Sequence, residues 1–125
     1  MLAERAEGRT MGEEIKRILM ELRSRFQELY GPRLVEMVLY GSLARGDEES
    51  GSDIDMLVVL KDDVSPAEEI ARTGGIVADL SLGHGVVISC VFVDERRFAK
   101  GTGPLLRNVR REGLPVSSSS GWQSA

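Results

Sequence analysis

The sequence has little cysteine and no long hydrophobic run. Its one cysteine, Cys90, excludes a disulfide within the chain, which fits a reducing compartment. The longest apolar run, residues 85–93, is much shorter than the roughly 20 residues that a membrane-spanning helix needs. Residues 1–10 carry charges where a signal peptide would need an apolar segment. We therefore expect a cytoplasmic protein that does not enter a membrane.

An excess of positive charge is also lacking. The chain has 16 Lys and Arg against 20 Asp and Glu, which gives a net charge of −4. Bulk binding to DNA or RNA depends on a basic surface that neutralises phosphates, so none is expected. With 125 residues, 42% of them hydrophobic and 29% charged, the composition is that of one globular domain.

Hydrophobic periodicity predicts an α/β fold. A long amphipathic helix begins after Thr10, which forms a capping box with Glu13, and stops at Gly31. A second helix begins near Ser65 and is weakened midway by a Gly-Gly pair that would allow a break. Strands are predicted at 33–40, 53–60 and 86–93, and short helices at 94–101 and 104–113.

Alternating helices and strands favour a small β-sheet covered by helices. We assign residues 10–113 to one domain and residues 1–9 to a flexible lead-in. The Ser-rich residues 114–125 are expected to be a disordered tail.

The stretch "YGSLARGDEESGSDIDMLVV", residues 40–59, holds the residues that predict chemistry. Asp53 and Asp55 stand two apart at the start of a strand. Their side chains should point to one face, where like charges are costly unless a cation lies between them. Upstream, Gly41 allows a phosphate to approach the backbone, and the Ser42 hydroxyl with free N–H groups can hold it. Mg²⁺ binds through one or two carboxylates plus substrate phosphates, so the stretch predicts a site for a metal-bound nucleoside triphosphate.

Two common motifs are excluded in the same stretch. Gly41 and Gly46 have P-loop spacing, but Asp47 stands where the phosphate-binding lysine must be. Counted from Asp47, a calcium loop would need a glycine at its sixth place and a bidentate glutamate at its twelfth. The sequence has a glycine at the fifth place and Val58 at the twelfth.

The segments "GSLARG" and "SDIDMLVV" together resemble the signature of the nucleotidyltransferase superfamily that includes DNA polymerase β. The short length and the ending "GPLLRNVRREG" resemble its minimal nucleotidyltransferases, many of which are paired as antitoxins with HEPN-domain proteins. The resemblance covers residues 10–113. It implies an α/β fold with a small mixed β-sheet, polymerase β-like in type.

The resemblance also implies an activity and a set of site residues. It implies Mg²⁺-dependent transfer of a nucleotidyl group from a nucleoside triphosphate, expected to be ATP, to a hydroxyl of a HEPN-type partner protein. Gly41 and Ser42 would grip the triphosphate, and Asp53 and Asp55 would be the catalytic metal ligands. Arg45 would be a phosphate contact or a structural brace.

One departure from that family keeps a second function open. Active members carry a third carboxylate on a later strand, and residues 86–93 contain none. Asp79, Asp94 and Glu95 flank that strand, and none is a clear substitute. The alternative is a non-catalytic module of the same fold that binds and regulates a partner protein. A third reading, transfer to a small molecule, would need a partner subunit to complete the acceptor site.

Two further residues have structural interpretations. His84, between two glycines, is interpreted as a loop residue and not as a catalytic base, because the sequence shows no positioned partner. Cys90 is interpreted as a packed, unreactive side chain.

Overall fold

The computed structural model describes residues 12–46 and 53–116. Its elements, in chain order, are helix α2 (Glu13–Tyr30), 3₁₀ turn η1 (Gly31–Arg33), strands β1 (Leu34–Tyr40) and β2 (Ile54–Leu60), helix α3 (Pro66–His84), strand β3 (Ile88–Asp94), helices α4 (Glu95–Lys100) and α5 (Pro104–Glu112), and strand β4 (Leu114–Pro115). In the described ranges, the helices include none with the length and hydrophobicity to cross a membrane.

The strands form one mixed sheet in the order β3-β2-β1-β4. β1 runs antiparallel to both β2 and β4, whereas β2 and β3 are parallel and are joined through α3. Parallel neighbours need such a crossover, which the long helix supplies. The prediction of a small mixed sheet with helices is confirmed.

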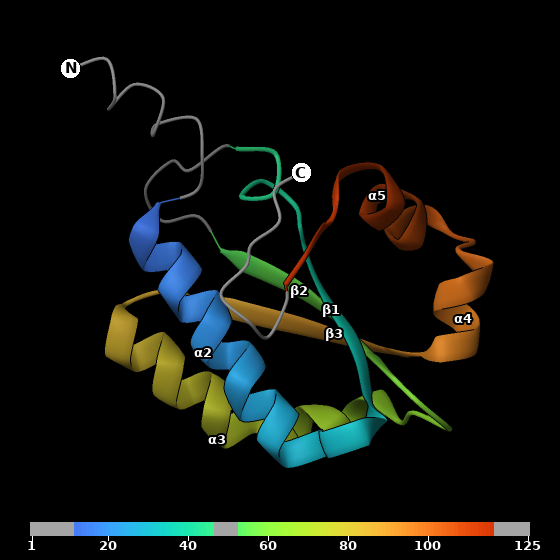
Figure 1. The fold of residues 1–125 in the computed structure, drawn as a ribbon, viewed down its shortest axis with the longest axis horizontal. Coiled ribbons are helices and arrows are strands. Elements are labelled where there is room, and N and C mark those ends of the chain that lie inside the picture. The colour runs from blue at the N-terminus through green and yellow to red at the C-terminus, as the bar shows by residue number, and fades with distance from the viewer. Residues whose placement is uncertain (1–11, 47–52, 117–125) are drawn as a thin grey trace.

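The helices cover the two faces of the sheet in separate pairs. Figure 1 shows α2 and α3 on one side and α4 and α5 on the other. Along β2, Met56 and Val58 belong to the larger hydrophobic cluster with α2 and α3, whereas Leu57 and Val59 belong to the smaller cluster with α4 and α5. Successive strand residues point to opposite faces, so Asp55 lies on the α4–α5 face.

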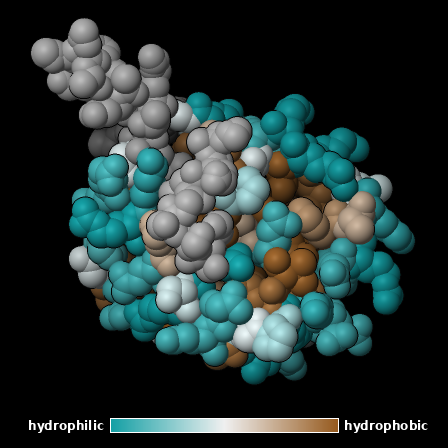
Figure 2. Space-filling model, in the orientation of Figure 1, coloured by the Kyte–Doolittle hydropathy of each residue, from teal (hydrophilic) through white to brown (hydrophobic). Residues whose placement is uncertain are grey.

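Hydrophobic side chains fill the space between the sheet and the α4–α5 pair. In the orientation of Figure 1, the space-filling view shows hydrophobic surface where the sheet meets this pair, within a mostly hydrophilic rim (Figure 2). The buried residues of this smaller cluster are Val38, Leu57, Val59, Val93, Leu106 and Val109. The packing of α5 against β1 therefore fixes where the C-terminal end of that helix lies.

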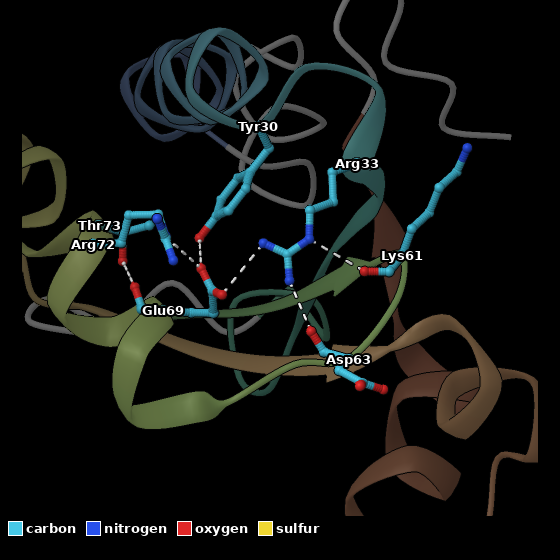
Figure 3. Close-up of polar contacts among 7 residues, drawn as sticks. All are labelled: Tyr30, Arg33, Lys61, Asp63, Glu69, Arg72 and Thr73. Atoms are coloured by element: carbon cyan, nitrogen blue, oxygen red, sulfur yellow. Dashed lines mark hydrogen bonds and ion pairs between the residues drawn. The ribbon is translucent and has the colours of Figure 1, made fainter.

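A buried carboxylate ties α2 to α3 at the base of the fold (Figure 3). The side chain of Glu69 is 2% exposed. It accepts hydrogen bonds from the Tyr30 hydroxyl at 2.6 Å and from Arg72 Nε at 3.0 Å, and it pairs with Arg33 Nη1 at 3.4 Å. Arg33 also donates to the backbone oxygens of Lys61 and Asp63. The cluster thus joins η1, the end of β2 and the start of α3.

The long helices were predicted closely, apart from two details. α2 begins at Glu13 with Gly12 in the N-cap position, and Thr10, the predicted cap, lies outside the described residues. α3 begins at Pro66 as expected but continues through Gly74 and Gly75 to His84. The break that the Gly-Gly pair would allow is therefore absent from α3, because packing against the sheet and α2 outweighs the roughly 1 kcal/mol that each glycine costs a helix.

The last strand was missed. Leu114 and Pro115 pair with Leu39 and Val38 of β1, and Val116 is 2% exposed. Sequence analysis placed these residues in the tail, because the Ser-rich composition that follows gave no strand signal. The sheet therefore extends two residues beyond the predicted boundary at residue 113, and residues 117–125 lie outside the described ranges.

Candidate nucleotide site

Gly41 and Asp55 meet where β1 ends and β2 begins. Tyr40, the last residue of β1, pairs in register with Asp55. Gly41 follows with φ +83°, and a Cβ built on it would lie 2.5 Å from Asp55 Oδ2. Real Cβ atoms essentially never approach so closely, so a side chain at position 41 would displace the Asp55 carboxylate, and the positive φ also favours glycine. Two residues that the motif separates by 14 positions thus form one compact corner.

Asp53 and Asp55 lie close enough to affect each other's charge. Asp53 is exposed just before β2, and Asp55 is half-buried within it. Burial raises the pKa of Asp55, and the neighbouring negative charge of Asp53 raises it further. The two carboxylates therefore form the crowded acidic pair that the i, i+2 spacing predicted.

Residues 42–46 form a single tight turn beside this pair. The Arg45 N–H donates to the carbonyl oxygens of Gly41 and Ser42 at 3.2 and 3.1 Å, and the Gly46 N–H donates to Leu43 at 3.1 Å. The side chain of Leu43 is buried in the core and anchors the turn. The Ser42 hydroxyl donates no hydrogen bond within residues 12–46 and 53–116, so it can bind a ligand. These residues form a hydrogen-bonded turn and not a helix.

Glu112 is a residue at this corner that sequence analysis missed. Its Oε2 accepts a hydrogen bond from the Gly41 N–H at 3.1 Å, and Arg45 Nη1 pairs with the same oxygen at 3.2 Å. Glu112 is the last residue of α5 and its side chain is 15% exposed. No motif spacing signals it, because it lies 71 residues from Gly41. The one sequence signal was its place in the family-like ending "GPLLRNVRREG".

None of the three flanking acids reaches the site. Ser89 is the residue of β3 in register with Asp55. Asp94, at the far end of β3, accepts from the Arg97 N–H as the N-cap of α4, and Glu95 is the first residue of that helix. Asp79 pairs with Arg25 of α2 at 2.8 Å. Within the described ranges, no three acidic, His or Cys side chains are grouped as metal ligands.

Cys90 and His84 lie outside the corner. Burial raises the pKa of the Cys90 thiol to about 12, so it stays protonated and unreactive at neutral pH, as expected. His84 is the last residue of α3 and not a loop residue, so that interpretation is wrong. Its ring lies 3.6 Å from Glu14 and 3.9 Å from Glu21, both on α2. It therefore helps to pair the two helices away from the corner.

Replacing Gly41 with alanine is expected to damage both the fold and the site. A non-glycine residue at positive φ costs about 1–2 kcal/mol, and the new Cβ would displace the Asp55 carboxylate. Gly85→Ala is the matched control, because Gly85 has φ +67° but nothing within 4 Å of its Cβ position. Urea denaturation should show comparable losses for both variants, whereas calorimetric binding of Mg²⁺ with ATP should fall only in Gly41→Ala. Equal binding by the two variants would show that the approach to Asp55 is unimportant.

The sequence model of the "Nucleotidyltransferase domain" family matches residues 19–113. Two relatives from Methanocaldococcus jannaschii are both named "Putative protein adenylyltransferase". One is 35% identical over 106 residues, covering 82% of this chain and 96% of the relative. The other is 31% identical over 99 residues, covering 76% of this chain and 66% of the relative.

Solved structures share the fold at low sequence identity. The crystal structure of a toxin–antitoxin with AMP-PNP contains a chain that aligns with TM-score 0.57 and 20% identity, covering 81% of this chain and 74% of its own. A Shewanella oneidensis structure, a tri-AMPylated HEPN toxin in complex with an MNT antitoxin, aligns with TM-score 0.50 and 19% identity, covering 83% and 73%. The family match spans most of the described residues and includes the whole corner, and on that ground the chain belongs to the nucleotidyltransferase domain family.

Proposed function

We propose that this protein transfers the nucleotidyl group of a nucleoside triphosphate, ATP in the first instance, to a hydroxyl of a partner protein. The observation that carries the proposal is the corner in which Gly41 packs directly on Asp55, with Asp53 and the Ser42 turn beside it. Membership of the nucleotidyltransferase family supports transfer as the reaction class. The names of the two archaeal relatives support a protein as the acceptor and ATP as the donor.

The donor set fits Mg²⁺. Asp53 and Asp55 offer two neighbouring carboxylates, and Mg²⁺ is commonly bound by one or two carboxylates with the remaining positions taken by water and phosphate oxygens. Asp53 and Asp55 would hold the ion. When bound, it would neutralise charge on the triphosphate and orient the departing pyrophosphate.

The protein's own residues bind and orient the donor. The Ser42 hydroxyl and the N–H groups at the start of its turn would donate hydrogen bonds to phosphate oxygens. In the reaction, the acceptor oxygen forms a bond to the α-phosphorus, and the bond from that phosphorus to the oxygen bridging the β-phosphate breaks. Pyrophosphate leaves and the hydroxyl proton passes to water. Placing the two reactants in line accounts for much of the acceleration in such transfers.

A partner of the HEPN class is the acceptor that we propose to test. The Shewanella structure pairs an MNT antitoxin with an AMPylated HEPN toxin. One chain of that complex shares the fold of this protein. In that complex the AMP groups are on the toxin, which supports a separate protein as the acceptor.

Calorimetric titration of the four ribonucleoside triphosphates tests the donor site without knowledge of the acceptor. Binding to the wild type is expected with Mg²⁺ and not with a chelator, and ATP is expected to bind tightest. Incubation with α-labelled ATP and a HEPN-type partner should then place the label on the partner. A wild type that binds no triphosphate at any Mg²⁺ concentration would overturn the proposal.

One observation favours the runner-up, a non-catalytic module that regulates its partner by contact. Ser89 stands beside Asp55 on the neighbouring strand, and no described side chain supplies a third carboxylate there. The labelling experiment separates the two functions. A partner that co-purifies with this protein but stays unlabelled in the presence of bound Mg²⁺ and ATP would establish the module.

A further inference from the structure

Glu112 links the end of α5 to the corner at the end of β1. Its carboxylate accepts from the Gly41 N–H at 3.1 Å and pairs with Arg45 Nη1 at 3.2 Å through Oε2 and 3.3 Å through Oε1. The contacted residues stand before and after Ser42 and Leu43. One side chain therefore holds both ends of the tight turn.

The fold gives Glu112 little freedom to move. The next residue, Gly113, donates to the Val109 carbonyl at 2.8 Å and closes α5. A Cβ on Gly113 would lie 2.5 Å from both Val109 O and Val38 Cγ1, so the backbone passes close to β1 at this point. Beyond it, the Val116 N–H donates to the Met37 carbonyl at 2.8 Å. The chain is thus fixed against β1 directly after Glu112.

We infer that Glu112 is a positioning residue of the nucleotide site, an inference that rests on the function proposed above. By holding the Gly41 N–H, it keeps the turn that carries Ser42 packed against Asp55. Because the Gly41 N–H already donates to Glu112, it is not free to bind phosphate. The Ser42 hydroxyl and the backbone N–H groups that follow Gly41 would donate those hydrogen bonds instead. The contribution of Gly41 is its missing Cβ.

Arg45 has a defined part in this arrangement. A carboxylate beside a triphosphate would repel it, and a paired guanidinium cancels that charge. Arg45 forms this ion pair with Glu112. The side chain of Arg45 is 55% exposed, and that of Glu112 is 15% exposed. Arg45 therefore acts on the nucleotide through Glu112. Of the two roles that the sequence left open, phosphate contact and structural brace, this is the structural brace.

The brace is tested in the protein without nucleotide. Hydrogen exchange of the Gly41 amide, followed by NMR, is expected to be about tenfold faster in Glu112→Ala than in the wild type, since a hydrogen bond to a charged acceptor is lost. Glu112→Gln keeps an acceptor oxygen and should restore most of the protection. Glu68→Ala, an exposed glutamate in the first turn of α3, is the control and should change nothing. Unchanged Gly41 exchange in Glu112→Ala would overturn the brace.

The positioning role is tested by calorimetry with Mg²⁺ and ATP. Glu112→Ala is expected to bind about tenfold more weakly, with most of the affinity restored in Glu112→Gln. Arg45→Ala should weaken binding strongly in the wild type and only slightly in the Glu112→Gln background, because the charge that it cancels is then absent. If Arg45 instead contacts phosphate directly, Arg45→Ala should lower the affinity equally in both backgrounds. That result would overturn the role of Arg45 as a brace.

The two experiments keep this inference separate from the proposed function. If the wild type binds no triphosphate, the function fails, and the exchange experiment still decides whether Glu112 holds the turn. If the wild type binds but Glu112→Ala binds equally well, the positioning role fails while the function stands. Equal weakening in Glu112→Ala and Glu112→Gln, with exchange restored only in the latter, would also count against positioning.

Discussion

Asp53→Asn combined with Asp55→Asn is expected to abolish Mg²⁺-dependent binding of ATP while the fold stays intact. Amide oxygens keep the shape of the side chains but lose the charge that a hard divalent cation requires. The Asp55 carboxylate faces Gly41 at the corner, so its charge lies where the metal and the phosphates would meet. Calorimetric titration with Mg²⁺ and with chelator measures the loss.

The same variant should be more stable than the wild type when no metal is present. Burial and the Asp53 charge raise the pKa of Asp55, so its ionised form is less favourable in the folded state than in the unfolded state. This penalty is absent below the unfolded pKa, near 3.8, and develops as the pH rises through the higher folded value. The melting temperature of the variant should therefore exceed that of the wild type at neutral pH and match it in acid.

Asp62→Asn combined with Asp63→Asn is the matched control. Both residues are exposed and follow the opposite end of β2, and the backbone oxygen of Asp63, which accepts from Arg33, is kept. Asparagine also tolerates the positive φ of 64° at Asp62. The Asp62 and Asp63 variant also loses two negative charges, at the opposite end of β2 from Asp53 and Asp55. It should bind Mg²⁺ and ATP like the wild type. A large loss of thermal stability in the Asp53 and Asp55 variant, or retained binding, would assign that pair a structural role.

The corner could be predicted from sequence because its parts are local. Gly41 and Ser42 directly follow β1, Asp53 and Asp55 lie at the start of β2, and the antiparallel pairing of the two strands brings these positions together. Fixed side-chain alternation then decides which face the carboxylates share. Predicting the corner required only that these four residues lie close together. It did not depend on the structure of the connecting residues 47–52.

Glu112 and β4 could not be predicted, since both depend on the packing of α5. Where that helix ends relative to β1 is decided by contacts between buried residues such as Val38, Leu106 and Val109. Leu114 and Pro115 form a strand of two residues, too short to carry a periodic pattern. The continuity of α3 through Gly74 and Gly75 has the same origin, because tertiary contacts override the low helix propensity of the two glycines.

Glu69→Ala should cause the largest loss of stability among the polar substitutions considered. Burial alone would raise the pKa of Glu69, but hydrogen bonds from Tyr30 and Arg72, with the charges of Arg72 and Arg33, outweigh it and hold the pKa below its ordinary value. Removing the carboxylate leaves the buried Tyr30 hydroxyl without its acceptor and opens space beneath η1. Arg33 and Arg72 are 28% and 47% exposed and can turn to water.

The loss is expected to be about 2–4 kcal/mol, between the cost of one unsatisfied buried group and that of a broken buried ion pair. Urea denaturation of the wild type, Glu69→Ala and Glu68→Ala measures it. The neighbouring Glu68 is exposed, so its variant should stay within about 0.5 kcal/mol of the wild type.

Because the folded pKa of Glu69 is lowered, its charge stabilises the fold above the unfolded value near 4.5, and this contribution disappears as the pH falls from there through the folded pKa. The gap between wild type and Glu69→Ala should therefore narrow in acid. A gap under about 1 kcal/mol at neutral pH would mean that desolvation cancels the hydrogen bonds and charges around Glu69.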